Sequence, residues 1–221
     1  AHNDLTILDL SNNTALGILY CYNNALTALD VSQNTSLAFF GTENNNITSL
    51  DVSANTALVQ LRCQNNQLTT LNMRNGVTDS LTTFYATNNA NLTCIETLDP
   101  DYATTNWTNA NSNIDEGVTF SVICGSEEQD VWHVATTGSD GSGNGTQESP
   151  FATIQMGINA AGNGNTVQVA AGTYVENIDF NKKNIAVISE QGPELTTIDG
   201  MESGSVAIMD STSNAELIGF H

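Results

Sequence analysis

Few residues of this chain have the types and spacing that acid–base, nucleophilic or metal chemistry requires. The three histidines, His2, His133 and His221, lie far apart in the sequence, and none has the spacing of a metal-ligand pair. The sequence contains no HExxH, GxSxG or CxxC pattern, and these are the arrangements that commonly hold zinc, an activated serine or a redox-active pair of thiols. We therefore expect no catalytic triad, no metal site and no cofactor.

One carboxylate pair, Asp179 with Asp199, could take up a catalytic geometry. Both follow short apolar runs that we expect to share a column on adjacent coils. Inverting glycosidases hold their two carboxyl groups about 6.5–9.5 Å apart, and adjacent coils approach that distance. Lys182 and Lys183 lie on the following turn and are candidates for a lyase base. Exposed carboxylates on a solvated face are the commoner arrangement, so we expect no catalysis here.

The run GSDGSGNG is similar to the start of a DxDxDG calcium loop. Asp140, Ser142 and Asn144 occupy alternate positions, but the twelfth position is Phe151, where an EF-hand requires a bidentate Glu. We favour a flexible glycine-rich turn and leave calcium binding near Asp140 open.

An apolar ladder organises the first half of the chain and must position any site there. The segments LTILDLSNN, LTALDVSQN, ITSLDVSAN and LTTLNMRNG begin at Leu5, Leu26, Ile47 and Leu68, which gives a period of 21 residues. Repeats of this length are too small to bury an apolar face alone and depend on their neighbours. The ladder therefore predicts a solenoid over about residues 5 to 92.

The second half of each repeat reads LGILYCYNN, LAFFGTENN, LVQLRCQNN or LTTFYATNN. Strand alternation turns every second residue of these segments inward. An asparagine follows each strand and should bond the backbone groups left open at the turn; these residues are Asn24, Asn45, Asn66 and Asn89. The residues that remain outward are Tyr20, Tyr22, Phe39, Glu43, Arg62, Gln64 and Tyr85.

These seven outward residues are the candidate binding site. Aromatic rings flanked by hydrogen-bonding groups stack on sugar faces or anchor a protein partner. An ordinary exposed sheet, rich in aromatics because they favour strands, is the alternative. The LDVSxN halves fit the same template, so they could form the concave strands instead. Asp9, Asp30 and Asp51 would then line up, which is costly unless a cation or backbone donors meet them.

The four cysteines fall into two pairs. Cys21 and Cys63 are two repeats apart, about 10 Å at the usual strand spacing, which is too far for a bridge, and we expect two buried thiols. Cys94 and Cys124 flank the irregular stretch after the repeats. A bridge between them would stabilise the fold by about 3 to 4 kcal/mol and would indicate an oxidising compartment. Two unpaired thiols are the alternative.

The pattern LxxLxCxxNxLxxLDVSxN resembles the short bacterial leucine-rich repeat of secreted Bacteroidetes proteins. The resemblance covers about residues 5 to 92. The segment NLTCIETLDPDYATTNWTNANSNIDEGVTFSVICG, residues 91–125, is similar to the disulfide-closed cap that ends such arrays, with Trp107 as a plug. This resemblance implies a leucine-rich repeat domain over residues 1–125, and the polar run GSEEQD places a linker at 126–130.

The remaining residues, 131–221, alternate between short apolar runs and turns. Ser149 and Pro150 form a helix start, after which Phe151, Ile154, Ile158 and Ala161 follow at helical spacing up to Gly162. We then expect strands in TVQV, ENIDF, NIAVIS, LTTIDG, SVAIMD and AELIGF. Two columns are predicted: Val167, Ile185 and Val206, and Ile178, Ile198 and Leu217.

The run from WHVATTGSDG to VENIDF resembles the N-terminal entry of right-handed parallel β-helices of the pectate-lyase-like superfamily. The motifs that carry it are FATIQ, TVQVAAGTYVEN and NIAVI, and Asn165 departs from it where that family often has Asp. The superfamily includes lyases, hydrolases and non-catalytic surface proteins, so the resemblance implies a fold and no single activity.

Composition excludes some classes of partner. Lys and Arg number 4 against 24 Asp and Glu, and the formal net charge of −20 repels nucleic acid and anionic lipid surfaces. The sequence has no apolar run long enough to span a membrane. Because it begins without Met and ends inside a strand-like run, we expect a fragment of a longer polypeptide.

The fold class expected is mainly β, a leucine-rich repeat solenoid with a cap followed by the start of a β-helix. The function expected is that of a non-catalytic part of an extracellular or cell-surface bacterial protein, whose repeats bind a polysaccharide or another surface protein. Two alternatives stay open: the front of a polysaccharide lyase or glycoside hydrolase whose active site lies on further coils, and a structural spacer.

Overall fold

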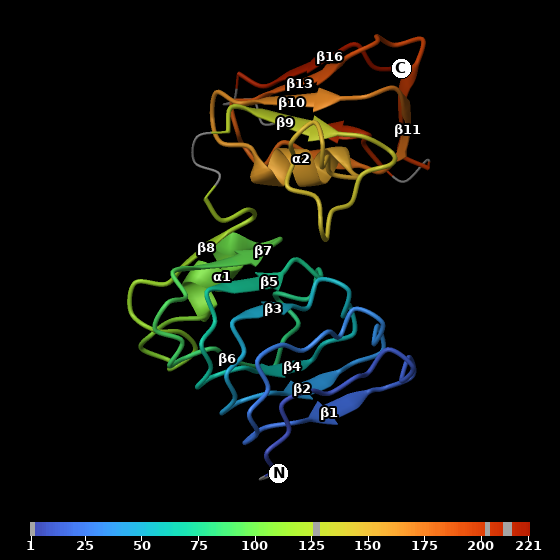
Figure 1. Cartoon of the computed structure of the whole chain (residues 1–221). Helices are drawn as coiled ribbons and strands as arrows, with labels where there is room; N and C mark the ends of the chain where they lie inside the picture. The colour runs from blue at the N-terminus through green and yellow to red at the C-terminus, as the bar shows by residue number, and fades with distance from the viewer. Residues whose placement is uncertain (1–2, 126–128, 202–203, 210–213) are drawn as a thin grey trace. The chain divides into compact units, whose positions relative to one another are not determined.

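The structure is a computed structural model that describes residues 3–125, 129–201, 204–209 and 214–221. Its residues form two compact units, Ala1–Cys124 and Gly125–His221 (Figure 1). Most of the expected linker, residues 126–128, lies outside the described residues. The strand pairs in both units are parallel, and helices are few. The expectation of a mainly β, solenoid architecture is therefore confirmed.

The first unit contains two four-stranded parallel sheets (Figure 1). The first sheet consists of β1 (Ile18–Tyr20), β2 (Phe39–Gly41), β4 (Gln60–Arg62) and β6 (Thr83–Tyr85). The second sheet consists of β3 (Ser49–Asp51), β5 (Thr70–Met73), β7 (Cys94–Thr97) and β8 (Thr119–Ser121). Both halves of the repeat therefore form strands, one in each sheet.

The apolar ladder forms the core between these sheets. Leu26, Ile47 and Leu68 are fully buried, whereas Leu5 on the first turn is 42% exposed because it has a neighbouring turn on one side only. The strand alternation predicted from the sequence is confirmed, since Phe40 and Leu61 point inward without exposed surface. Full burial of each such side chain contributes about 1.5–3 kcal/mol.

Buried asparagines join successive turns. The Asn66 amide nitrogen donates to the Thr42 and Cys63 carbonyls at 3.0 and 3.2 Å, and its oxygen accepts from the Ile47 amide at 3.0 Å. Asn45 repeats this pattern one turn earlier and Asn89 one turn later. The predicted structural role of the asparagine column is confirmed.

A second column of buried asparagines lies at the turns after the LDVSxN halves, and sequence reasoning did not single it out. Asn34 donates to the Asn13 carbonyl at 2.8 Å, and Asn55 donates to the Val31 and Asn34 carbonyls at 3.0 and 2.9 Å. Both columns thus satisfy buried carbonyls that the parallel strands leave unpaired.

Residues 91–125 close the last turn of the first unit. Helix α1 (Pro100–Asn106) begins after the N-cap Asp99 and was not predicted. Trp107 is 5% exposed, and its ring centroid lies 4.4 Å from that of Phe84, so its predicted role as a plug is confirmed. The Asp115 carboxylate accepts from the Asn88 and Asn89 amides at 2.9 Å, donors that a further turn would otherwise meet.

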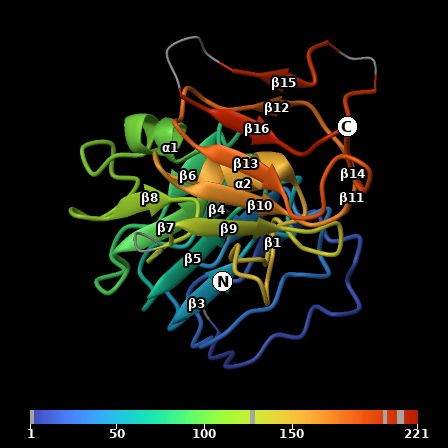
Figure 2. The same ribbon diagram turned by 90° about the horizontal axis from the view of Figure 1, so that it is seen from above.

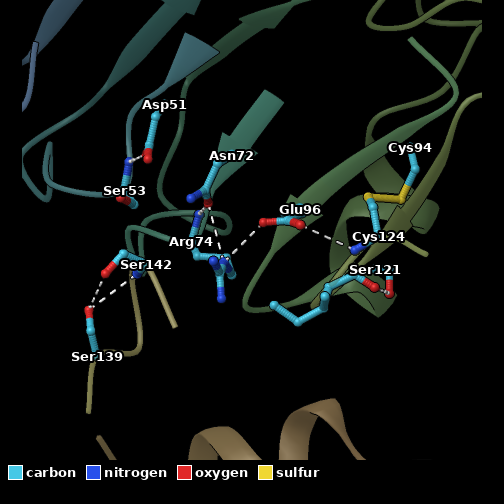
Figure 3. Close-up of polar contacts among 11 residues, drawn as sticks. Asp51, Ser53, Asn72, Arg74, Cys94, Glu96, Ser121, Cys124, Ser139 and Ser142 are labelled. Atoms are coloured by element: carbon cyan, nitrogen blue, oxygen red, sulfur yellow. Dashed lines mark hydrogen bonds and ion pairs between the residues drawn. A yellow bond between two sulfur atoms is a disulfide. The ribbon is translucent and has the colours of Figure 1, made fainter. Parts of the chain in front are cut away.

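The expected disulfide joins Cys94 to Cys124, with their Cα atoms 5.9 Å apart. Figure 3 shows Glu96 between the bridge and Arg74. The Glu96 carboxylate lies 3.2 Å from Arg74 Nε and accepts from the Cys124 amide at 3.3 Å. The side chain of Arg74 is 4% exposed, so its charge is buried beside Glu96. The bridge therefore fastens residue 124 to β7, and the ion pair fastens β7 to the residue that follows β5.

The second unit is built from one larger sheet and two narrow ones. The larger sheet contains β9 (Val131–Val134), β10 (Thr166–Val169), β13 (Ala186–Ser189) and β16 (Glu216–Ile218), which lie side by side in Figures 1 and 2. The narrow sheets pair β11 (Gly172–Val175) with β14 (Thr196–Asp199), and β12 (Ile178–Asp179) with β15 (Ala207–Ile208). The predicted strands are present; β11 was missed.

The two columns predicted for this unit are wrong. Val167 is in register with Val187 and, through β13, with Leu217; it is not in register with Ile185 or Val206. Ile198 pairs with Tyr174, and Ile178 pairs with Ala207. The turns of this unit differ in length, so a fixed spacing in the sequence does not identify residues that share a column.

Helix α2 spans Ile154–Ala160, with Thr153 as its N-cap, and so begins later than the predicted start at Ser149 and Pro150. Phe151 is held in a bridge with Val134: its amide donates to the His133 carbonyl at 3.0 Å. This pairing with β9 delays the helix, although Ile154 and Ile158 are buried as predicted.

The glycine-rich loop is not the flexible turn expected. The amides of Asn144 and Gly145 both donate to the Ser149 carbonyl at 3.0 Å, and the Ser139 amide donates to Pro150 at 3.0 Å. A Cβ at Gly138 would lie 2.2 Å from the Phe151 carbonyl oxygen, so glycine is required by close packing of the backbone. No helix among the described residues is long and apolar enough to cross a membrane.

The disulfide leads to a first prediction. Denatured, unreduced protein should contain two free thiols, those of Cys21 and Cys63, which are both buried and unpaired in the fold. Replacing Cys94 and Cys124 together by Ser should lower the free energy of unfolding by about 3–4 kcal/mol. A thiol titration and urea denaturation measure these quantities. Four free thiols would contradict the bridge, and Cys63→Ala serves as a control that leaves it intact.

The asparagine column leads to a second prediction. Asn66→Ala leaves the buried Ile47 amide without an acceptor, which costs about 1–3 kcal/mol. It also removes one hydrogen bond from each of the Thr42 and Cys63 carbonyls, which keep their bonds from Asn45 and Asn89. We expect the free energy of unfolding to fall by about 2–4 kcal/mol in urea denaturation. Asn46→Ala is the matched control, because Asn46 is exposed and its side chain bonds the Gln67 side chain. Equal losses for the two variants would show that the column does not join the turns.

Candidate functional site

The outer face of the first sheet brings together all seven residues of the predicted binding site. Strand register places Tyr20, Gly41, Arg62 and Tyr85 in one column, and Ile18, Phe39, Gln60 and Thr83 in a second. A third column follows two positions after the first and contains Tyr22, Glu43, Gln64 and Thr87. We call this set of twelve residues the outer face.

Aromatic and aliphatic side chains of the outer face are open to solvent. Tyr20 is 48% exposed, Phe39 and Tyr85 are each 37% exposed, and Ile18 is 58% exposed. The rings of Tyr20 and Tyr22 meet edge to face with centroids 6.5 Å apart. The sequence analysis missed Ile18, Gln60 and Gly41; the alternation that identified Tyr20 could have found the first two.

Gly41 has no side chain, and its neighbours fill the space that a Cβ would take. A Cβ at this position would lie 2.8 Å from Tyr20 Cδ1 and 2.9 Å from Glu43 Oε2. The Tyr20 ring and the Glu43 carboxylate therefore lie directly on the Gly41 backbone. About half of the Tyr20 side chain stays exposed, so aromatic surface is available to a ligand.

The polar groups beside these rings are incompletely paired by the protein. Glu43 Oε2 and Gln64 Oε1 are buried, and within the described part of the chain neither accepts a hydrogen bond. Arg62, in contrast, bonds the Gln60 amide oxygen when that amide is turned toward it. Two buried acceptors on neighbouring strands therefore have no hydrogen-bond donor, and leaving a buried acceptor without a donor is unfavourable.

The aspartates on the side of the second sheet accept hydrogen bonds from backbone amides. Asp9, Asp30 and Asp51 each accept, through Oδ1, the amide of the serine two residues later at 2.8–3.0 Å. Figure 3 shows this turn at Asp51 and Ser53. The bond from the backbone amide lowers the pKa of Asp9 and of Asp30 below the ordinary value. Backbone donors, the alternative to a cation, therefore meet this acidic column.

The carboxylate pair Asp179 and Asp199 does not form. Asp179 is in register with Ile208 in one narrow sheet, and Asp199 with Val175 in the other. Each carboxylate instead accepts the backbone amide two residues later, at 2.8 and 2.9 Å. The expectation of a shared column was wrong because the narrow sheets pair β12 and β14 with different strands.

Lys183 has a structural role that excludes it as a free lyase base. Its ammonium group donates to the carbonyls of Ile158, Asn159 and Ala161 at 2.8–2.9 Å, at the end of α2. A cation at this end of a helix complements the helix dipole.

Two carboxylates hold the other end of α2. Asp140 accepts from the amides of Ala152 and Thr153 at 2.8 and 3.1 Å and from the Thr153 hydroxyl at 2.7 Å. Glu176 accepts from the amides of Ile154 and Gln155 at 2.8 and 2.9 Å. The residue considered for calcium is thus engaged by protein donors.

The histidines and thiols remain unsuited to catalysis. His133 Nδ1 lies 4.0 Å from a Glu190 carboxylate oxygen, which is a weak contact, and His2 lies outside the described residues. Burial raises the pKa of the Cys63 thiol to about 12 and also raises that of Cys21. Both groups therefore stay protonated at neutral pH and are poor nucleophiles. Among the described residues, no group of three His, Cys, Asp or Glu side chains is placed to hold a metal ion.

Comparison with known proteins gives limited matches. Residues 136–184, which include the glycine-rich loop and α2, match a family described as "Protein of unknown function (DUF1565)". No curated protein matches the chain.

Among solved structures, the chain is similar to the functional domain of InlJ from Listeria monocytogenes, which is described as including a cysteine ladder. The identity is 18% and the TM-score is 0.39. The match covers 97% of this chain and 52% of that chain, so the chain spans about half the length of that structure.

Glu176 leads to a prediction about pH. Burial, supported by the nearby Asp140 carboxylate, raises its pKa above the ordinary 4.5 although backbone amides oppose the shift. The folded protein then binds this proton more tightly than the unfolded chain. The resulting stabilisation is complete below pH 4.5 and is lost as the pH rises through the raised pKa.

Glu176→Gln removes this titration. The free energy of unfolding of the wild type, minus that of the variant, should therefore fall as the pH is increased from 4.5. Urea denaturation at several pH values between 4 and 8 measures the difference. Glu148→Gln, on an exposed loop position, is the control and should show no such trend. A difference that stays constant with pH would contradict the assignment.

Proposed function

We propose that this chain is part of a secreted or cell-surface bacterial protein, and that its first unit binds a glycan through the outer face. In this proposal residues 1–125 form a leucine-rich repeat domain closed by a cap at 91–125. Residues 131–221 form the capped start of a right-handed parallel β-helix. The observation that carries the proposal is the outer face, where exposed rings and unpaired acceptors occupy adjoining columns.

The chemistry of the outer face favours a sugar over a protein. Sugar rings offer an apolar face that stacks on Tyr or Phe and a rim of hydroxyl donors, and the face supplies both counterparts. A protein partner would require a larger contiguous interface, about 800 Å² on each side, than four strands of three residues readily present. A bound protein is therefore the alternative outcome of the experiment below.

The disulfide supports the proposed location. Structural disulfides persist in oxidising compartments and are rare in the cytosol, and the Cys94–Cys124 bridge fastens the cap to β7. The match to a family associated with β-helix proteins supports the proposed second domain. Asp179, Asp199 and Lys183, which suggested an enzyme, are used in hydrogen bonds to the backbone, so catalysis forms no part of the proposal.

Glycan-array binding of the full chain tests the proposal. We expect Tyr20→Ala and Tyr85→Ala each to weaken binding by about fivefold to tenfold, because each variant loses a stacking ring worth about 1 kcal/mol or more. Retention on the array, followed by titration calorimetry with the strongest glycan found, measures the effect.

Ile7→Ala is the matched control. Ile7 is 81% exposed and lies on the opposite side of the unit, before the second sheet. Its replacement should leave glycan binding unchanged. No retained glycan, or binding indifferent to both tyrosine variants, would overturn the proposal, and capture of a protein ligand that requires Tyr20 would replace the glycan by a protein partner.

A further inference from the structure

The spacing of the tyrosines on the outer face sets the length of a ligand. Tyr20 and Tyr85 lie at the two ends of the same column, with Gly41 and Arg62 between them. Parallel strands are about 4.8 Å apart, so the two rings are about 14 Å apart across the strands. The strand spacing is close to the advance per ring of an extended oligosaccharide, so the four strands of the column match about four successive sugar rings.

The position of the unpaired acceptors sets where hydroxyl groups would be recognised. Glu43 Oε2 meets the Tyr20 ring over Gly41, and Gln64 Oε1 is on the next strand of the third column. A sugar stacked on Tyr20 carries its hydroxyl groups at the rim of the ring, beside Glu43. A second ring, one strand further along, reaches Gln64. Both oxygens are covered by neighbouring side chains, so these side chains must turn aside before a hydroxyl group reaches either oxygen. Both acceptors would then gain the donors that the protein does not supply.

The charge of the outer face sets the charge of the ligand. Glu43 is the one carboxylate and Arg62 the one cation among its twelve residues, all of which the structure describes. Arg62 is bonded to Gln60, and the net charge of the whole chain is −20. An anionic sugar would meet repulsion from Glu43 and from the protein as a whole, so the face suits an uncharged chain.

We infer that the outer face binds a linear, uncharged oligosaccharide that crosses the strands from Tyr20 to Tyr85 and fills about four ring positions. Tyr20 and Tyr85 stack on its terminal rings, and Glu43 and Gln64 accept hydrogen bonds from hydroxyl groups between them. This inference rests on the proposed glycan-binding function and adds the direction, length and charge of the ligand.

Calorimetric titration of the full chain tests it with oligosaccharides of one to six rings. The probes are cello-, xylo- and manno-oligosaccharides, with oligogalacturonates of the same lengths as the charged match. We expect affinity for at least one uncharged series to rise at least tenfold from one ring to four. It should then change less than about twofold from four rings to six. Oligogalacturonates of four rings should bind at least tenfold more weakly.

Two variants test the acceptors. Gln64→Ala should weaken binding of the four-ring probe about fivefold and leave the one-ring probe unchanged. Glu43→Gln should reduce the preference for uncharged probes over oligogalacturonates by at least threefold. Glu116→Gln and Gln33→Ala, at exposed positions away from the outer face, are the matched controls. The urea midpoint of each variant verifies that the fold is retained.

The outcomes separate this inference from the function on which it rests. Affinity independent of chain length, a preference for oligogalacturonates, or no binding by any uncharged probe would overturn the inference. If a glycan found on the array still requires Tyr20 and Tyr85 in those cases, the proposed function stands. If the array retains nothing, both are overturned.

Discussion

The first unit depends on buried asparagine amides that bind two turns at once. Asn66 donates to carbonyls of its own turn and of the preceding one, and accepts the amide of Ile47. A short parallel strand leaves such groups unpaired where it turns, and burying them without partners would cost more than one strand can supply. Each turn must therefore repeat the hydrogen bonds of its neighbour, which keeps the strands in register although the step between strands grows from 21 residues to 23 at β6.

This register gives the two faces of each strand different roles. Inward positions are restricted to apolar or small residues by the packed ladder, and Phe40 and Leu61 have no exposed surface. Outward positions carry no such restriction, yet the same register aligns them in columns. Tyr20 and Tyr85 thus share a line across the sheet although the sequence separates them widely. The outer face is the proposed recognition surface because the inward residues are packed in the core.

In the second unit, charged side chains bond the backbone groups that would otherwise lack partners. Its turns vary in length, so no single repeated asparagine can join them. Asp140 and Glu176 take up four successive amides at the start of α2, and the Lys183 ammonium takes up three carbonyls at its end. These groups would suggest acid–base chemistry if read in isolation. Their hydrogen bonds show instead that they close the end of the solenoid.

The sequence by itself determined the solenoid of the first unit, its buried asparagine column, the paired and unpaired cysteines, and the seven outward residues. These follow from a repeated pattern, since a recurring LxxLxxxxN segment converts sequence position into place on the strand even where the step grows from 21 residues to 23. Only the tertiary structure decided the columns of the second unit, the late start of α2 and the separation of Asp179 from Asp199, because variable turns and long-range pairing of Phe151 with β9 override local patterns. It also showed that Glu43 Oε2 and Gln64 Oε1 lack partners, since these two side chains do not recur at the same position in each turn and their hydrogen bonding depends on what surrounds them.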